Sequence, residues 1–254
     1  MDLENPVKRR LSEGKTVFGC FIPQDSATTV EILALAGFDF VLLDAEHGPI
    51  SPESAYPMIL AAEAHGILAF ARIGQNDKQV ILKFLDLGIA GVMVPQINNA
   101  AQAEQAVAAT KFAPRGTRGL AGGRAFEFGL KRSAPEMVRI LDDRVLTIIQ
   151  FEHRDALADL DAILAVPDLD VLFVGPNDLA QSLGFPGHPG HPDVTRMGDE
   201  VVARAKARGV KVGTVAPDSA SAIAAIERGF DMIVANSPGL LAGAAKTYID
   251  GVNR

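Results

Sequence analysis

Short apolar runs alternate with longer amphipathic segments over most of the chain. Eight of these runs are rich in Val, Ile, Leu and Phe, and they are nearly continuous instead of alternating with polar residues. Runs of this kind are typical of parallel strands that are buried on both faces. The predicted strands are Val17–Ile22, Phe40–Leu43, Leu68–Ile73, Gly91–Val94, Val145–Phe151, Val171–Val174, Val210–Val215 and Met232–Ala235.

The segments between these runs have helical periodicity, and several end at a glycine that can adopt the left-handed conformation of a helix C-terminus. Examples are Ser54–His65, Lys78–Leu87, Ala100–Thr110, Asp155–Ala165, Asp193–Arg208, Ser219–Arg228 and Leu240–Ile249. The glycines are Gly37, Gly66, Gly88, Gly209 and Gly229. Eight strand–helix units in 254 residues predict an α/β fold, a single (β/α)8 TIM barrel over residues 1–254.

An open, doubly wound sheet is the alternative fold with this pattern. That fold usually carries a glycine-rich phosphate loop after its first strand. Here the first strand is followed by Pro23-Gln24-Asp25-Ser26, so the barrel is favoured. The longest irregular stretch is Pro114–Ser133, which is rich in glycine and arginine. Long loops in compact domains are often functional, and a flexible excursion or a subunit contact is the alternative.

Composition narrows the function classes. The net charge of −7 disfavours nonspecific binding to nucleic acids or anionic membranes. Cys20 is the only cysteine, so no intrachain disulfide can form, and a reducing compartment is expected. The first fifteen residues lack an apolar run of signal-peptide length, and no run approaches the length of a membrane span. These features predict a cytoplasmic protein.

Two carboxylates follow neighbouring predicted strands. Glu152 lies after the fifth strand and Asp178 after the sixth. Parallel neighbours are about 4.8 Å apart, so the two side chains could close on one hard cation. Two carboxylates with several open positions suit Mg²⁺ or Mn²⁺, with Co²⁺ or Zn²⁺ as further candidates. The alternative is that both are solvated loop acids.

Arg72 follows the fully apolar residues Leu68–Ala71 near the end of the third predicted strand. A lone arginine at a strand end needs an anionic partner, and a substrate carboxylate suits its bidentate geometry. The alternative is a salt bridge to Asp44, Glu46 or Glu152.

Three further residues are candidates for the site. Gln150 and Glu152 are separated by one residue, so both side chains could point into the barrel. Gln150 could then donate a hydrogen bond to a substrate carbonyl, or it could only fill space in the barrel. His47 enters a loop and has a side chain suited to general base catalysis, or it is a surface histidine. Asp86 lies at a helix C-terminus, which the helix dipole disfavours, and this hints at a partner such as a histidine.

The lysines separate amine catalysis from metal catalysis. A Schiff-base enzyme needs a lysine inside the barrel. The sixth strand, Asp170–Val174, has none, and Lys211 lies at the start of the seventh strand, which is the wrong end. Metal catalysis is therefore favoured over amine catalysis.

Taken together, these residues resemble the HpcH/HpaI family of class II pyruvate aldolases. The likeness runs from about Val17 to about Ile233. The matching motifs are Ala36-Gly37-Phe38-Asp39, Leu43-Asp44-Ala45-Glu46-His47, Ala71-Arg72-Ile73, Leu85-Asp86-Leu87-Gly88, Val94-Pro95, Pro114-Arg115-Gly116-Thr117-Arg118-Gly119, Gln150-Phe151-Glu152, Phe173-Val174-Gly175-Pro176-Asn177-Asp178-Leu179, Gly184-Phe185-Pro186-Gly187 and Gly190-His191-Pro192.

The resemblance implies an aldehyde-lyase that reversibly cleaves 4-hydroxy-2-oxo acids to pyruvate and an aldehyde through a metal-stabilised enolate. Glu152 and Asp178 would hold the ion, which the 2-oxo acid chelates. Arg72, with Gln150 nearby, would stabilise the enolate oxygen. The backbone of Gly175, Pro176, Asn177 and Asp178 would bind the pyruvate carboxylate.

The resemblance also implies that His47, oriented by Asp86, is the base. It further implies a homo-oligomer, a hexamer built as a trimer of dimers, with Arg118–Gly129 and the C-terminal helix as candidate contacts. The chain departs from the family pattern at Phe21, where Trp is frequent, and over Leu120–Leu130. Both could line the aldehyde side, so they bear on substrate identity.

Two alternatives remain. One is a citrate-lyase β-like enzyme acting on CoA thioesters, for which Arg115, Arg118 and Arg124 could bind the CoA phosphates. The chain is short for that class and shows no C-terminal lid. The other is a non-catalytic barrel, against which the intact set of candidate residues argues.

Overall fold

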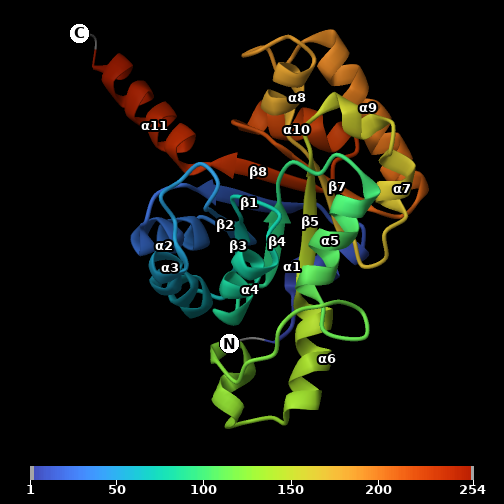
Figure 1. Cartoon of the computed structure of the whole chain (residues 1–254). Helices are drawn as coiled ribbons and strands as arrows, with labels where there is room; N and C mark the ends of the chain where they lie inside the picture. Colours follow the sequence, from blue (N-terminus) through green and yellow to red (C-terminus); the bar gives the residue numbers. More distant parts are fainter. Residues whose placement is uncertain (1–2, 253–254) are drawn as a thin grey trace.

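The computed structural model describes residues 3–252 and places eight strands in a closed parallel barrel, paired in chain order from β1 to β8 (Figure 1). This confirms the TIM barrel and excludes the open sheet. No bound differs from the predicted strand by more than one residue. The strands are β1 Val17–Ile22, β2 Phe40–Asp44, β3 Leu68–Arg72, β4 Gly91–Val94, β5 Leu146–Phe151, β6 Val171–Val174, β7 Lys211–Val215 and β8 Met232–Asn236.

The helices agree less closely with the sequence prediction. The segment Asp155–Ala165 is not one helix, because a 3-10 turn, η2 Arg154–Leu157, is followed by a short helix, α7 Leu160–Leu164. The five predicted C-terminal glycines do have positive φ angles. The other helices are α1 Pro6–Ser12, α2 Ala27–Leu35, α3 Pro52–Ala64, α4 Lys78–Asp86, α5 Ala100–Thr110, η1 Arg124–Gly129, α6 Ala134–Arg144, α8 Pro176–Ser182, α9 Pro192–Ala207, α10 Ser219–Glu227 and α11 Ser237–Gly251.

Large rings and glycines alternate in the barrel interior. Phe40 is the register partner of Gly19, and a Cβ at Gly19 would lie 2.2 Å from the Phe40 ring. A Cβ at Gly213 would likewise lie 2.6 Å from the ring of its partner Phe173. Phe70 stacks on Phe40 with ring centroids 4.6 Å apart. Aromatic rings in the otherwise aliphatic interior thus fit because a glycine stands beside them, as expected where close packing leaves no spare volume.

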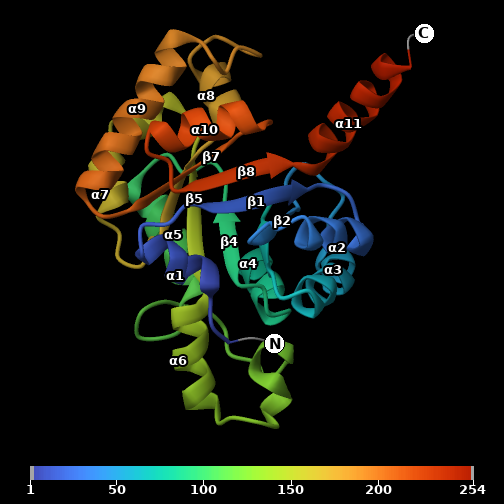
Figure 2. The same cartoon turned by 180° about the vertical axis from the view of Figure 1, so that it is seen from behind.

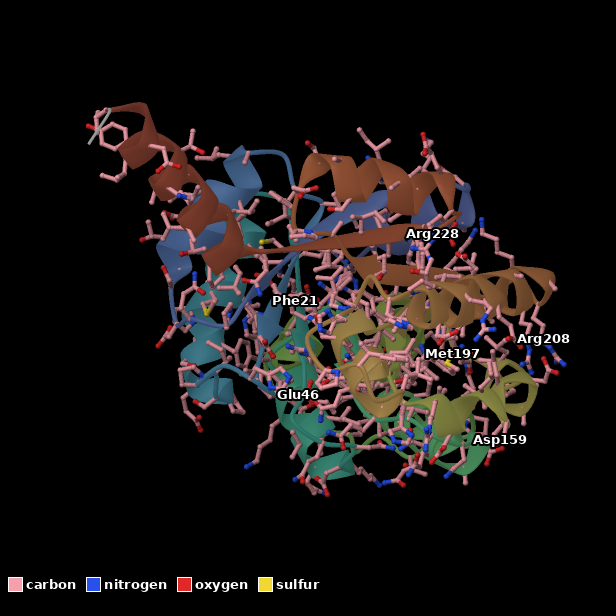
Figure 3. The ribbon with its side chains drawn as sticks, turned by 90° about the horizontal axis from the view of Figure 1, so that it is seen from above. Phe21, Glu46, Asp159, Met197, Arg208 and Arg228 are labelled. Carbon is pink, nitrogen blue, oxygen red and sulfur yellow. The ribbon has the colours of Figure 1, made fainter. Side chains whose placement is uncertain are left out.

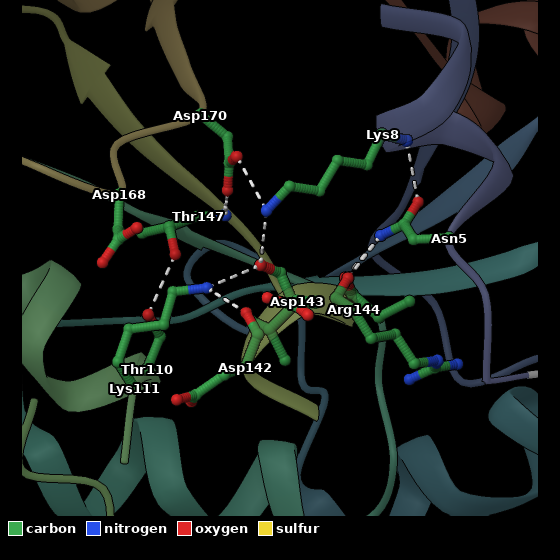
Figure 4. A network of polar contacts seen from close by, with 12 residues as sticks. Asn5, Lys8, Thr110, Lys111, Asp142, Asp143, Arg144, Thr147, Asp168 and Asp170 are labelled. Atoms are coloured by element: carbon green, nitrogen blue, oxygen red, sulfur yellow. Dashed lines mark hydrogen bonds and ion pairs between the residues drawn. The ribbon is translucent and has the colours of Figure 1, made fainter. Parts of the chain in front are cut away.

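The N-terminal end of the barrel is closed by α1 and a polar network (Figure 4). Lys8 of α1 pairs with Asp170 at 2.9 Å. Lys111 is fully buried, and its Nζ donates to the carbonyl oxygens of Asp142 and Val145 at 2.6 and 3.1 Å. Burial lowers the pKa of Lys111 to about 8. This end is therefore tied together internally, whereas the strand mouths at the other end are open.

The C-terminal helix α11 projects away from the barrel (Figures 1 and 2). In a TIM barrel the helix after each strand normally packs on the outer face. Only Ser237 of α11 is buried, and the remaining residues of the helix are exposed. No helix within residues 3–252 is long and apolar enough to cross a membrane.

Candidate active site

Strand alternation brings polar side chains to the top layer of the barrel interior. Asp44 continues the inward series of β2, Arg72 that of β3 and Gln150 that of β5, above the apolar interior cluster. Asp44 and Arg72 are also register partners on adjacent strands. The predicted strand-end residues therefore lie on one layer facing one opening.

The guanidinium of Arg72 is fixed on three sides. Its Nε and Nη2 donate to the two oxygens of Asp44 at 2.9 and 2.6 Å, and its Cζ lies 4.5 Å from the ring centroid of Phe21. Its Nη1 is 3.4 Å from Oε2 of Glu46. Asp44 already occupies the bidentate face, so a substrate carboxylate cannot use it. The salt-bridge alternative is thus realised, and Nη1 remains as a single-point donor.

The pKa values of the two acids beside Arg72, Asp44 and Glu46, shift in opposite directions. Burial alone would raise the pKa of Asp44, but the hydrogen bonds and charge of Arg72 lower it below its usual value. Burial raises the pKa of Glu46, against the opposing charge of Arg72. Figure 3 labels Phe21, which comes from β1, and Glu46, which lies in the turn after β2. Asp44 is therefore the ionised partner of the arginine, and Glu46 is left without a full countercharge.

Glu152 is held by two donors at the end of β5. The backbone N–H of Gln96 donates to its Oε1 at 2.6 Å, and Nε2 of Gln150 donates to its Oε2 at 2.8 Å. Burial raises the pKa of Glu152 to about 7, and the charges of Glu46 and Asp178 add to the rise. Gln150 therefore orients the carboxylate, with its own Oε1 buried and unpaired among the described residues.

Gly175 lets Glu152 approach the loop after β6. A Cβ on Gly175 would lie 3.2 Å from both Cβ and Oε2 of Glu152. The N–H of Gly175 is taken by the carbonyl of Phe151, and Pro176 has no N–H. The N–H groups of Asn177 and Asp178, in the first turn of α8, therefore have no partner inside the helix.

Two cavities open side by side at the mouth. His47 and Asp178 line both of them. The first, of about 380 Å³, is also lined by Glu46, Gln96, Asn98, Glu152, His153, Gln181 and Ser182. The second, of about 470 Å³, is also lined by Phe21, Pro23, Asp44, Arg72, Gln150, Phe173, Gly175, Pro176, Asn177, Val215 and Asn236. Their size is that of a small-molecule site.

The residues present fit a divalent ion with few protein ligands. Within residues 3–252 no group of three His, Cys, Asp or Glu side chains is placed to hold a metal. Glu152 and Asp178 border the same cavity. Among the described residues each oxygen of Glu152 accepts one hydrogen bond, which leaves a lone pair for a cation. With Glu46 they form an acidic group whose mutual repulsion a cation would relieve. Mg²⁺ commonly binds through one or two carboxylates and keeps its waters.

His47 and Asp86 are not brought together within this chain. His47 is 63% exposed at the mouth, and its Nε2 is 4.0 Å from Oε2 of Glu46. Asp86 ends α4, the helix that returns to the opposite end of the barrel, and its carboxylate lies 3.7 Å from Nη2 of Arg118. Burial raises the pKa of Asp86, and Arg118 partly opposes this. The pairing that the resemblance implies therefore cannot form between these two residues of one chain.

The long arginine-rich segment is tied to the protein instead of open to solvent. Arg118 is buried under α4, Nη2 of Arg124 donates to Glu63 at 2.6 Å, and Nε of Arg115 donates to Asp168 at 3.1 Å. The three candidates for binding CoA phosphates are thus already paired.

Comparison of the sequence and the structure with known proteins identifies the family of this chain. The family model described as HpcH/HpaI aldolase/citrate lyase matches residues 17–241. The chain belongs to this family. An HpcH/HpaI family structure from Burkholderia cenocepacia is 32% identical, covers 98% of this chain and 100% of its own, and superposes with a TM-score of 0.93.

Curated relatives in the HpcH/HpaI family are similar over most of their length. A pyruvate aldolase from Rhizobium etli is 37% identical over 89% of this chain and 88% of its own. A 2-keto-3-deoxy-L-rhamnonate aldolase from Klebsiella pneumoniae is 36% identical over 87% of this chain and 82% of its own. The resemblance drawn from the motifs is thereby confirmed at the level of the family.

Proposed function

We propose that this chain is a metal-dependent pyruvate aldolase that cleaves 4-hydroxy-2-oxo acids reversibly to pyruvate and an aldehyde. The observation that carries the proposal is the shared mouth, where a fixed Arg72 faces two carboxylates, Glu152 and Asp178, on neighbouring strand ends. Family relatives named as a pyruvate aldolase and a 2-keto-3-deoxy-L-rhamnonate aldolase support the same reaction class.

Glu152 and Asp178 would hold Mg²⁺ or Mn²⁺, which supplies Lewis-acid stabilisation of negative charge on the 2-oxo acid. The N–H groups of Asn177 and Asp178 would bind the pyruvate carboxylate at the start of α8. Nη1 of Arg72 is the donor left for the enolate oxygen, since Asp44 occupies the rest of the guanidinium. Preorganised positive charge at this oxygen lowers the barrier because the enolate is the high-energy species.

His47 would act as the base. In the cleavage direction it accepts the proton of the C4 hydroxyl, the bond between C3 and C4 breaks, and the bonding electrons form the enolate. The aldehyde leaves, and a proton from solvent converts C3 to the methyl group of pyruvate. His47 lines both cavities, so it can reach a substrate bound across them.

The His47–Asp86 pair would form between subunits. Asp86 lies at the far end of its own barrel, but its side chain is 31% exposed and can meet a second copy. The proposed homo-oligomer, a hexamer made of dimers, provides such a contact. Because each mouth would draw His47 from one chain and Asp86 from another, the complete site requires assembly.

The uncovered α11 supports an oligomer. Its Leu241 and Ile249 are 72% and 46% exposed. An apolar groove of about 340 Å³ lies against β1, β8 and α10, where the last helix of a barrel would pack, and is lined mainly by Phe18, Phe38, Ala222, Ile223, Ile226 and Ile233. A second copy that places its α11 on this groove would bury both surfaces.

Subunit mixing tests the reaction and the shared site together. His47→Ala and Asp86→Asn variants, each checked for folding by circular dichroism, are assayed for pyruvate release from a 4-hydroxy-2-oxo acid. Each alone is expected to be nearly inactive. A 1:1 mixture that exchanges subunits regains about one quarter of the sites, because only the chain with His47 beside the chain with Asp86 is complete. A mixture that stays inactive although its subunits have exchanged would contradict the shared site. An Asp86→Asn variant that is fully active on its own would deny Asp86 its role.

The CoA-thioester lyase is the weaker candidate. Its three candidate arginines are paired with Asp168, Asp86 and Glu63, and none of them lines either mouth cavity. Measured binding of CoA at micromolar concentration would reverse this preference.

A further inference from the structure

The mouth of the barrel has two chemically different halves. Strands β2, β3, β5 and β6 present the acids, Arg72 and Gln150. On the other side, the larger cavity is lined by Phe21 of β1, Val215 of β7 and Asn236 of β8. No charged side chain among the described lining residues lies on this second half. Pyruvate occupies the charged half in the proposed reaction, so the aldehyde fragment is left with the neutral half.

The position of Asn236 follows from strand alternation. Met232 and Val234 of β8 belong to the interior cluster, so Asn236, two residues further, continues the inward series. It is also the register partner of Phe21 on β1. Asn236 therefore stands in the top layer of the barrel, facing the same opening as Arg72.

The side-chain amide of Asn236 makes no hydrogen bond to the residues that the structure describes, 3–252. Asn236 is the N-cap residue of α11, a position where asparagine usually accepts a backbone hydrogen bond. Here no side-chain cap bond forms, and Pro238 removes one of the usual donors because it has no N–H. The next residue, Ser237, is held by Gln24, whose Nε2 donates to its Oγ at 3.0 Å. An exposed amide with no partner among the described residues thus lines the cavity.

We propose that Asn236 binds a hydroxyl group of the aldehyde fragment, and that this fragment is uncharged and hydroxylated. The inference rests on the proposed aldolase function. An amide offers both a donor and an acceptor, which matches a hydroxyl group that donates and accepts. Phe21 and Val215 provide apolar contact for the carbon atoms beside it.

A carboxylated or phosphorylated aldehyde fits this half poorly. Arg72 is the one Arg or Lys among the described lining residues, and its Nε and Nη2 are bound by Asp44. Asp44 and Asp178 border the same cavity. A second anionic group would therefore be desolvated beside two carboxylates without a free cationic partner, which is unfavourable.

The test compares aldol additions of pyruvate to three aldehydes, followed by NMR. They are 2-hydroxypropanal, propanal, which has the same skeleton without the hydroxyl, and succinic semialdehyde, which carries a carboxylate. The wild-type protein is expected to prefer 2-hydroxypropanal in kcat/KM. In Asn236→Leu this preference over propanal should fall roughly 3- to 10-fold, the worth of one partly exposed hydrogen bond, with the KM for pyruvate unchanged. Asn98→Leu makes the same change in the cavity with the acidic residues. Whatever its effect on kcat, it should keep the preference between 2-hydroxypropanal and propanal.

Exchange of the pyruvate methyl protons with solvent needs no aldehyde. It therefore distinguishes a failure of the proposed role of Asn236 from a failure of the proposed aldolase function. Exchange that is intact in Asn236→Leu, together with an unchanged aldehyde preference, would overturn the role of Asn236 and leave the aldolase standing. A wild-type preference for the semialdehyde would overturn the uncharged assignment. Absence of exchange in the wild-type protein would instead defeat the proposed function itself.

Discussion

Replacing Gly175 by alanine adds a single methyl group against the carboxylate that we propose as a metal ligand. The new Cβ would lie 3.2 Å from Cβ and Oε2 of Glu152. Carbon atoms prefer separations of about 3.5–4.0 Å, so Glu152 must move by a few tenths of an ångström. The backbone of Gly175 does not resist the change, because its φ of −91° and ψ of 92° are open to alanine.

Such a displacement is large for a metal site. Ligand distances in these sites hold to within about 0.2 Å. Loss of a positioning contact around a ligand typically weakens metal affinity about 10- to 100-fold, which is about 1.4 to 2.7 kcal/mol. Gly175→Ala should therefore bind Mn²⁺ about 10- to 100-fold more weakly in calorimetric titration, while its thermal unfolding changes little.

Gly123→Ala is the matched control for this prediction. Gly123 is also the residue before a helical segment, and a Cβ there meets nothing within 4 Å. It should bind Mn²⁺ like the wild-type protein. Equal Mn²⁺ affinity in Gly175→Ala and Gly123→Ala would refute the reasoning that the position of Glu152 determines the metal site.

Three further changes follow from the same contacts. Asp44→Asn removes the charge that holds Arg72, and it should lower kcat about 10- to 100-fold with little change in metal affinity; an unchanged kcat would show that Arg72 needs no such support. In metal-free protein, Glu152 binds a proton more tightly folded than unfolded, so stability should fall by up to about 3 kcal/mol as pH rises from about 4.5 to 7. Urea unfolding of Glu152→Gln should lack this fall, and an identical pH profile would contradict it. Gly213→Ala places a Cβ 2.6 Å from the Phe173 ring and should cost about 1–3 kcal/mol in urea unfolding, unlike the unobstructed Gly123→Ala.

The strands could be predicted from the sequence because each is an apolar run bounded by polar residues. Buried parallel strands leave this signature directly in the residue pattern. The sequence pattern does not predict the helix α8, Pro176–Ser182, because this helix is short and begins directly after the strand end at Gly175. The prediction of one helix over Asp155–Ala165 is wrong. The hydrophobic periodicity continues across the backbone break between η2 and α7, and hydrophobicity gives no sign of that break.

The sequence predicts which site residues face the barrel interior wherever these residues lie on or next to a strand, because alternate positions of a strand point inward. Counting inward positions places Gln150 and Glu152 correctly, and the same count on β8 would have indicated Asn236. The partner of Arg72 remained open because three nearby acids were equally plausible from sequence, and only the register pairing of Asp44 with Arg72 decides among them.

The contact between Gln96 and Glu152 and the position of Asp86 differ in how far the sequence indicates them. The contact of Gln96 with Glu152 depends on a positive φ of 57°, which no side-chain pattern encodes. The position of Asp86 could have been questioned, because a helix that follows a barrel strand returns to the opposite end. The direction of α4 thus separates Asp86 from His47 before any distance is measured.

Exchange of the pyruvate methyl protons for deuterium, followed by NMR, tests the central claim most directly. It detects the enolate without requiring the aldehyde to be known. The account predicts exchange with Mg²⁺ or Mn²⁺, loss of exchange after chelation, and loss in Glu152→Gln and Asp178→Asn variants that remain folded. Exchange that persists without metal, or no exchange with any divalent ion, would contradict the proposed metal-dependent aldolase.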